Sequence, residues 1–179
     1  MIIILEKPFF PNMRVVNMPD MGIERIFELL LPCTQLVAVY LGGNHIITRD
    51  LPFICHFTKL RKVDLSANKI HYLPEQQQIS QLTELEFLLL HKNEIVGWAQ
   101  IERLMGLKKL RQLSLYGNPC SKILGYRQFM LTNMTHLWCL DEILVQDFEH
   151  KNVVAEQFIR DSLRPERAKK LKRFRPFNP

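Results

Sequence analysis

The sequence predicts an α/β solenoid, with a short parallel sheet on its concave face and helices or extended turns on its convex face. Four segments align in register, and they begin at Leu36, Leu60, Leu85 and Leu110. Each has apolar residues at its first, fourth, sixth and eleventh positions and an asparagine at its ninth. These asparagines are spaced 24, 25 and 25 residues apart, at Asn44, Asn68, Asn93 and Asn118. A period of this length is typical of stacked supersecondary units that share one core.

The repeated segments predict the strands, because each contains an alternating apolar pattern. A weaker copy, MRVVNMPDMGI, begins at Met13 and has Met21 in place of the asparagine. A truncated sixth copy, LWCLDEI, begins at Leu137. An asparagine amide donates and accepts hydrogen bonds together, so it can satisfy backbone groups where the chain leaves each strand. We therefore expect the four asparagines to form a structural ladder.

The segments between the repeats predict helical or extended returns. Residues 97–107 have Trp98, Ile101, Leu104 and Met105 at helical spacing, and residues 75–82 form a shorter helical turn after Pro74. Residues 22–36 place Ile26, Phe27, Leu30 and Leu31 on one helical face, which Pro32 ends. These apolar stripes are expected to be core.

The pattern resembles the leucine-rich-repeat signature, and the end of the repeats is similar to the C-terminal cap of the SDS22-like subfamily. The residues that match this cap are Asn118, Pro119, Tyr126, Arg127, Leu137, Leu140 and Asp141. Thr135 stands where that subfamily usually has proline. The resemblance implies a leucine-rich-repeat solenoid. The expected domains are an N-terminal edge cap (1–12), repeats (13–118), a C-terminal cap (119–146), an amphipathic helix (147–163) and a basic C-terminal tail (164–179).

The strand alternation predicts a binding surface on the concave side. The third and fifth positions of each repeat point away from the core, and aromatic or apolar residues there have no packing role. The candidate protein-binding residues are Tyr40, Lys62, Asp64, Phe87, Leu89, His91, Arg111 and Tyr116. Basic residues, including Arg61 and Lys92, lie around the aromatic ones. The alternatives are that a cap or tail of the same chain covers them, or that they are scattered surface residues.

The net charge of +6 lies in the tail. Residues 164–179 contain seven of the 24 basic residues and Glu166 alone of the 18 acidic ones, so residues 1–163 are balanced. The basic residues of the tail are Arg164, Arg167, Lys169, Lys170, Lys172, Arg173 and Arg175. The tail could be a solvated end, could bind an acidic protein surface with Phe174 and Phe177 as anchors, or could contact nucleic acid or anionic lipid.

We expect no enzyme and no cofactor, because the chain has no catalytic constellation and no glycine-rich phosphate loop. Cys120 lies in the slot that isoleucine fills in the other repeats, so it is expected to be core and not a nucleophile. The other cysteines are Cys33, Cys55 and Cys139, with no CxxC pair. A zinc site with His56 and His136 is the alternative to buried, reduced thiols. The sequence has no apparent signal peptide or membrane span, so a soluble intracellular protein is expected.

The cap and the basic tail resemble those of ciliary leucine-rich-repeat and IQ-motif proteins and of the leucine-rich-repeat light chain of outer-arm dynein. This resemblance implies a protein-binding adaptor of the axoneme or of microtubules, with tubulin or axonemal proteins as partners of the tail. The alternatives are a nuclear ribonucleoprotein scaffold like the A-prime protein of the U2 particle, and a phosphatase-regulatory subunit. The expected location is the cytoplasmic cytoskeleton or cilium, with the nucleus as the alternative; a membrane partner is not expected.

Overall fold

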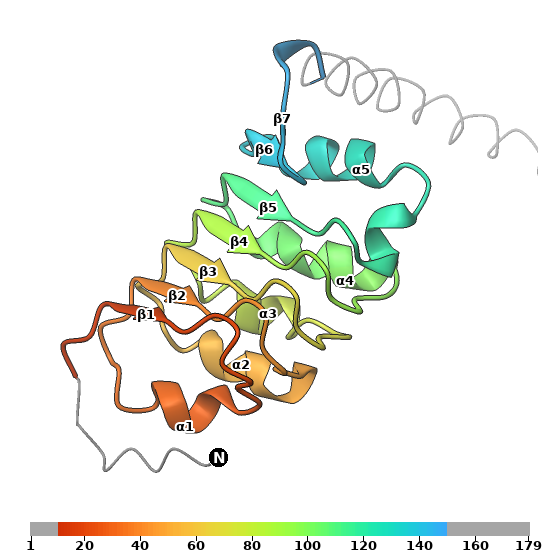
Figure 1. Cartoon of the computed structure of the whole chain (residues 1–179). Helices are drawn as coiled ribbons and strands as arrows, with labels where there is room; N and C mark the ends of the chain where they lie inside the picture. The colour runs from red at the N-terminus through yellow and green to blue at the C-terminus, as the bar shows by residue number, and fades with distance from the viewer. Residues whose placement is uncertain (1–10, 150–179) are drawn as a thin grey trace, which may run out of the picture.

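One sheet runs through all the repeats in chain order, in a computed structural model that describes residues 11–149. Its strands are β1 (Val15–Asn17), β2 (Ala38–Tyr40), β3 (Lys62–Asp64), β4 (Phe87–Leu89), β5 (Gln112–Ser114), β6 (Cys139–Leu140) and β7 (Ile143–Leu144). Strands β1 to β6 pair in parallel and β7 pairs with β6 antiparallel. The helices lie along one side of the sheet (Figure 1). The expected α/β solenoid is confirmed.

Short helical segments return the chain from one strand to the next. They are α1 (Ile26–Leu30), η1 (Thr48–Asp50), α2 (Leu51–Ile54), α3 (Gln76–Ile79), α4 (Trp98–Arg103), η2 (Leu104–Gly106), η3 (Pro119–Lys122) and α5 (Tyr126–Asn133). The elements α4 and η2 cover residues 98–106 of the return expected at 97–107, and α3 lies within the expected turn at 75–82. The sequence pattern did not predict the helical return between β2 and β3, which consists of η1 and α2.

The expected apolar face of the first helix is wrong in part. Ile26 and Leu30 of α1 are buried, but Phe27 is 42% exposed and Leu31 is 57% exposed. A helix of five residues turns only one narrow face to the sheet, and residues four apart share it. The neighbouring residues point outward, and the Phe27 ring packs against the Phe53 ring of α2 at 4.7 Å.

The core is a set of apolar columns, one residue from each repeat. Val39, Val63, Leu88 and Leu113 stand at the centres of successive strands, paired in register, and all are buried. The eleventh-position column ends at Cys120, which is fully buried like its isoleucine counterparts. A cavity of about 40 Å³ remains between the repeats that begin at Leu60 and Leu85. The residues that line it include Val63, Leu65, Ile79 and Leu88.

The asparagines form a ladder that ties each repeat to the one before it. The Asn68 amide donates to the carbonyls of Leu65, at 3.1 Å, and of Leu41 in the preceding repeat, at 2.9 Å. Its oxygen accepts from the backbone nitrogen of Ile46, also in the preceding repeat, at 2.9 Å. The other three asparagines repeat this pattern, with Asn44, Asn93 and Asn118 each bonded to their own and the preceding repeat.

The C-terminal end of the repeats is closed by polar contacts. The Asp141 carboxylate accepts hydrogen bonds from the backbone nitrogens of Leu115, at 2.6 Å, and Tyr116, at 2.8 Å. Arg127 donates from Nε to Glu149 at 2.8 Å and from its Nη1 to the carbonyl of Leu140 at 3.3 Å. These bonds replace those that a further full repeat would make.

Some expectations concern residues outside the described range. These are most of the N-terminal edge cap, the amphipathic helix beyond residue 149 and the whole basic tail. Within residues 11–149, no helix combines the length and the apolar character needed to cross a bilayer.

Candidate functional site

The open face of the sheet carries the side chains that flank each buried strand centre. Tyr40 ends β2, Lys62 and Asp64 begin and end β3, and Phe87 and Leu89 begin and end β4. All five side chains are half-buried, and the residues of β3 pair in register with those of β2 and β4. The parallel pairing therefore places them side by side on one surface.

A lysine joins two aromatic rings at the middle of this surface. The Lys62 ammonium lies 5.0 Å from the centre of the Tyr40 ring and 5.7 Å from the centre of the Phe87 ring. Both distances are within the range of cation–π attraction. The lysine stem and the two rings thus form one continuous cluster across β2, β3 and β4, with a positive charge above apolar surface.

Asp64 lies on the same strand as Lys62, and Ser66 holds its carboxylate by hydrogen bonds. Its Oδ1 accepts hydrogen bonds from the backbone nitrogen of Ser66 at 2.9 Å and from the Ser66 hydroxyl at 2.6 Å. These bonds fix the carboxylate at the carboxyl end of β3, two residues along the strand from the ammonium of Lys62. The face therefore presents opposite charges at the two ends of one strand.

A second aromatic pair extends the surface toward the C-terminal cap. The His91 and Tyr116 rings stack with centroids 4.6 Å apart and planes 9° apart, just beyond the ends of β4 and β5. The Ser114 hydroxyl lies 3.3 Å from Nδ1 of His91, and Ser114 is fully buried, although its position in the repeat predicts an open one. Burial and the neighbouring Glu142 carboxylate raise the pKa of the Tyr116 phenol.

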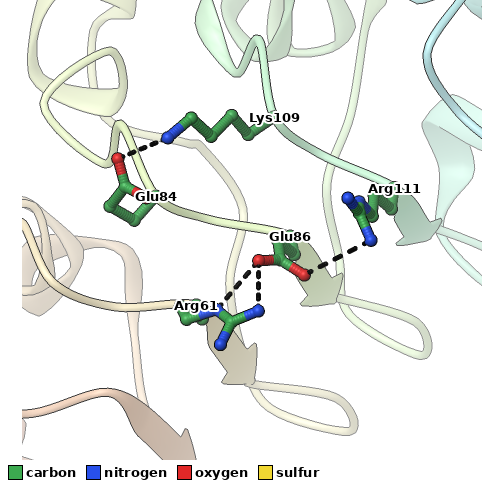
Figure 2. A network of polar contacts seen from close by, with 5 residues as sticks. All are labelled: Arg61, Glu84, Glu86, Lys109 and Arg111. Atoms are coloured by element: carbon green, nitrogen blue, oxygen red, sulfur yellow. Dashed lines mark hydrogen bonds and ion pairs between the residues drawn. The ribbon is translucent and has the colours of Figure 1, made fainter.

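A row of charges runs along the amino ends of the strands. Arg61, Glu86 and Arg111 each directly precede a strand, and Figure 2 shows Glu86 between the two arginines. Glu86 accepts from Nε of Arg61 at 2.8 Å and lies 3.9 Å from Nη1 of Arg111. One carboxylate thus holds two guanidinium groups, and the row keeps a net positive charge.

Trp138 adds a residue that the repeat pattern did not identify. Its ring is 53% exposed, and the Arg111 guanidinium lies 5.8 Å from the ring centre. Trp138 occupies the second position of the truncated sixth repeat, one strand beyond Arg111. Aligning LWCLDEI with the earlier repeats could have identified Trp138. It shares the second position with Arg61, Glu86 and Arg111, which carry charges on this face.

The cysteines have the properties of core residues. Cys33, Cys55 and Cys120 are buried, Cys139 is half-buried, and all four are free thiols. Burial raises the pKa of Cys55 and of Cys120 to about 11, which disfavours the thiolate that nucleophilic or metal-binding chemistry needs. Residues 11–149 contain no group of three or more His, Cys, Asp and Glu side chains arranged to hold a metal ion.

Comparisons with known proteins place the fold in a family. The family model described as Leucine-rich repeat matches residues 9–173. A chain of the Drosophila melanogaster SNF/U2A′ complex superposes with a TM-score of 0.66 at 22% identity, and the match covers 89% of this chain and 86% of that one. At this identity the likeness concerns the fold.

Curated relatives match at about 30% identity. Leucine-rich repeat-containing protein 51 of Bos taurus is 32% identical over 55% of this chain and 48% of its own length. Dynein axonemal assembly factor 11 of Trypanosoma brucei brucei is 31% identical over 73% of this chain and 33% of its own length. Leucine-rich repeat and IQ domain-containing protein 3 of Mus musculus is 32% identical over 68% of this chain and 19% of its own length. The chain therefore spans about half of these relatives or less.

Proposed function

This chain belongs to the leucine-rich-repeat family, and we propose that it is a non-enzymatic adaptor that binds a protein on its concave face. The observation that carries the proposal is the cluster of Tyr40, Lys62 and Phe87 on the open side of the sheet. Solvent-facing aromatic side chains grouped with a cation are typical of the energetic centres of protein interfaces. The candidate interface extends through Leu89 to the stacked rings of His91 and Tyr116.

The proposed setting of this adaptor is the ciliary axoneme or a microtubule assembly. The support comes from one relative at 31% identity, which is named as a dynein axonemal assembly factor. Expression of the tagged chain in ciliated cells, viewed by fluorescence microscopy, tests this setting. We expect signal along the cilium or at its base; accumulation in the nucleus with neither of these would contradict it.

The binding face is tested by a double substitution, Tyr40→Ala with Phe87→Ala. Affinity purification followed by mass spectrometry should recover specific partners with the parent chain and lose at least about nine-tenths of them with this variant, because two central aromatic side chains are removed. The melting temperature should change little, since neither side chain is fully buried. The matched control is Tyr72→Ala with Phe148→Ala, two aromatic residues that are more than half exposed elsewhere. Equal recovery by both variants would count against this face.

The basic tail, residues 164–179, is proposed to bind an acidic protein surface, with tubulin as the candidate. Its seven basic residues against one acidic residue would suit an anionic partner. Co-sedimentation with taxol-stabilised microtubules tests this, with the full chain and a 164–179 deletion compared at low and high salt. We expect binding that weakens with salt and is lost on deletion. Salt-dependent binding to RNA with none to microtubules would favour the nucleic-acid alternative.

A further inference from the structure

Positive and negative charges lie along opposite edges of the concave face. In each strand from β1 to β6, the first residue and the residue just before it form the amino edge of the face. The charged residues of this edge are Arg14, Arg61, Lys62, Glu86 and Arg111. Four are basic and one is acidic, and the acidic one is the Glu86 that lies between two arginines. The amino edge therefore has a net charge of three positive units.

The opposite edge has the opposite sign. It consists of the last residue of each of these strands and the three residues after it. The charged residues of this carboxyl edge are Asp20, Asp64, Lys92, Asp141 and Glu142. Four are acidic and one is basic, which gives a net charge of three negative units. Hydrogen bonds fix Asp64 and Asp141 in place, so the sorting is part of the folded surface.

On β2 and β4 the first and last strand positions carry no charge, and they form an apolar band among the charges of the neighbouring strands. The band consists of Ala38, Tyr40, Phe87 and Leu89, all half-buried on the open side of β2 and β4. A three-residue strand spans roughly 10 Å, which is close to the ~10–12 Å diameter of an α-helix with its side chains. Adjacent strands lie ~4.8 Å apart, and helix residues three or four apart are separated by ~5–6 Å. A helix laid across the strands therefore matches both the width and the repeat of the face.

From this arrangement we propose that the concave face binds a helix that has an apolar stripe, an acidic flank and a basic flank. The inference rests on the proposed binding role of the face and specifies its partner. The stripe lies on the apolar band, the acidic flank lies over the amino edge and the basic flank over the carboxyl edge. Lys62 is the central contact of the acidic flank, because its ammonium lies over the band between the Tyr40 and Phe87 rings. The two flanks fix the direction of the bound helix.

A library of helical peptides displayed on phage tests the proposal with the full chain as target. Peptides of about 16 residues cover the five strand spacings from β1 to β6. Their stripe positions are fixed as leucine, and their flank positions are random mixtures of Glu, Lys and Ser. We expect selection to enrich peptides with Glu on one flank and Lys on the other. A synthetic peptide of this kind should bind about tenfold more tightly than one of equal composition with mixed flanks, and salt should reduce the difference.

Three variants locate the selected binding. Phe87→Ala with Leu89→Ala removes much of the apolar band and should abolish enrichment. Arg14→Glu with Lys62→Glu reverses two charges of the amino edge and should remove the preference for a Glu flank. The matched control, Arg49→Glu with Lys122→Glu, makes the same change in net charge on η1 and η3, away from the strands, and should leave the preference intact.

The outcomes separate this inference from the proposed function. Enrichment that depends on Phe87 and Leu89 but yields mixed or single-sign flanks overturns the sorted-charge partner and leaves the binding face in place. The flank preference is measured with the unmodified chain, so a result of mixed or single-sign flanks overturns the sorted-charge partner even if a variant does not fold. Absence of any enrichment that depends on Phe87 and Leu89 overturns both the partner class and the concave face as a helix-binding surface.

Discussion

The Asp141 carboxylate accepts a hydrogen bond from the backbone nitrogen of Tyr116 across 2.8 Å, and the same oxygen accepts from Leu115. Asp141→Ala would leave two backbone donors without partners at the end of the last full repeat. We expect it to lower the free energy of unfolding by about 2–6 kcal/mol, at ~1–3 kcal/mol for each unpaired group. Denaturant unfolding followed by circular dichroism measures this.

Asp141→Asn is the matched control for this substitution. Asparagine keeps an acceptor oxygen at the same place, and it tolerates the positive φ of 53° that residue 141 adopts. We therefore expect it to retain most of the stability. An alanine variant as stable as the asparagine variant would show that the carboxylate is not needed to close the repeats.

The ladder predicts a large effect from one buried asparagine. Asn93→Ala removes three donated bonds, to the carbonyls of Leu65, Leu90 and His91, and one accepted from Ile70. We expect the free energy of unfolding to fall by about 2–4 kcal/mol, because buried backbone groups lose their partners. Asn133→Ala is the control, since Asn133 is exposed and bonds only the carbonyl of Phe129. Equal losses for the two variants would contradict the structural role of the ladder.

The cavity beside Val63 predicts a stabilising substitution. Val63→Ile adds one methylene next to about 40 Å³ of empty space, so it should raise the free energy of unfolding by about 0.8 kcal/mol. Val39→Ile makes the same change at the paired position of β2, which is fully buried and does not line the cavity. Overpacking there should cost about 1 kcal/mol or more. Thermal unfolding compares the two, and a loss in both would mean that the cavity does not accept the methyl group.

The buried thiols predict slow chemistry in the native state. With a pKa of about 11, Cys120 has about one thiolate in a thousand molecules at pH 8, and Cys55 is similar. Iodoacetamide should therefore label both slowly in native buffer and quickly in denaturant, as measured by mass spectrometry of the peptides. Rapid native labelling of Cys120 would reopen its interpretation as a nucleophile.

The same shifts set a pH dependence of stability. In the unfolded chain these thiols ionise near their ordinary pKa of 9.0, whereas in the folded chain they stay neutral to about 11. Ionisation of these thiols should therefore leave the free energy of unfolding unchanged below pH 8. It should lower that free energy between about pH 9 and 11, where the thiols ionise in the unfolded chain and not in the folded one. Cys120→Val, which retains an apolar side chain, should make that fall shallower.

The repeats were predictable from the sequence because each strand position is constrained in several copies at once. The register of Val39, Val63, Leu88 and Leu113 follows from the asparagine spacing, and so does the burial of Cys120. Positions in the middle of the face, such as Tyr40 and Phe87, follow from strand alternation. Their contact with Lys62 does not, because alternation gives the side of the sheet and not the rotamer.

The features that escaped prediction lie where the repeat no longer constrains the chain. The helix α1 is too short for helical spacing to decide between Phe27 and Ile26 as its buried residue. The antiparallel β7 begins at Ile143, where the truncated sixth copy ends, so no other copy offers a template for its pairing with β6. Ser114 is buried and contacts His91, whose ring stacks on Tyr116 of the next repeat, and a single-repeat pattern does not contain such contacts between repeats.

The direction of the ladder has a consequence for synthesis on the ribosome. The asparagine of each repeat accepts from a backbone nitrogen of the repeat before it, as Asn68 does from Ile46 and Asn118 does from Ile95. The backbone hydrogen bonds of each repeat are thus completed by the asparagine of the next repeat, which is translated later. A nascent chain always ends in a repeat with unpaired backbone groups until Asp141 has left the exit tunnel. Co-translational folding of this domain is therefore finished by its cap, and a stalled chain that lacks the cap would expose that unfinished edge to chaperones and proteases.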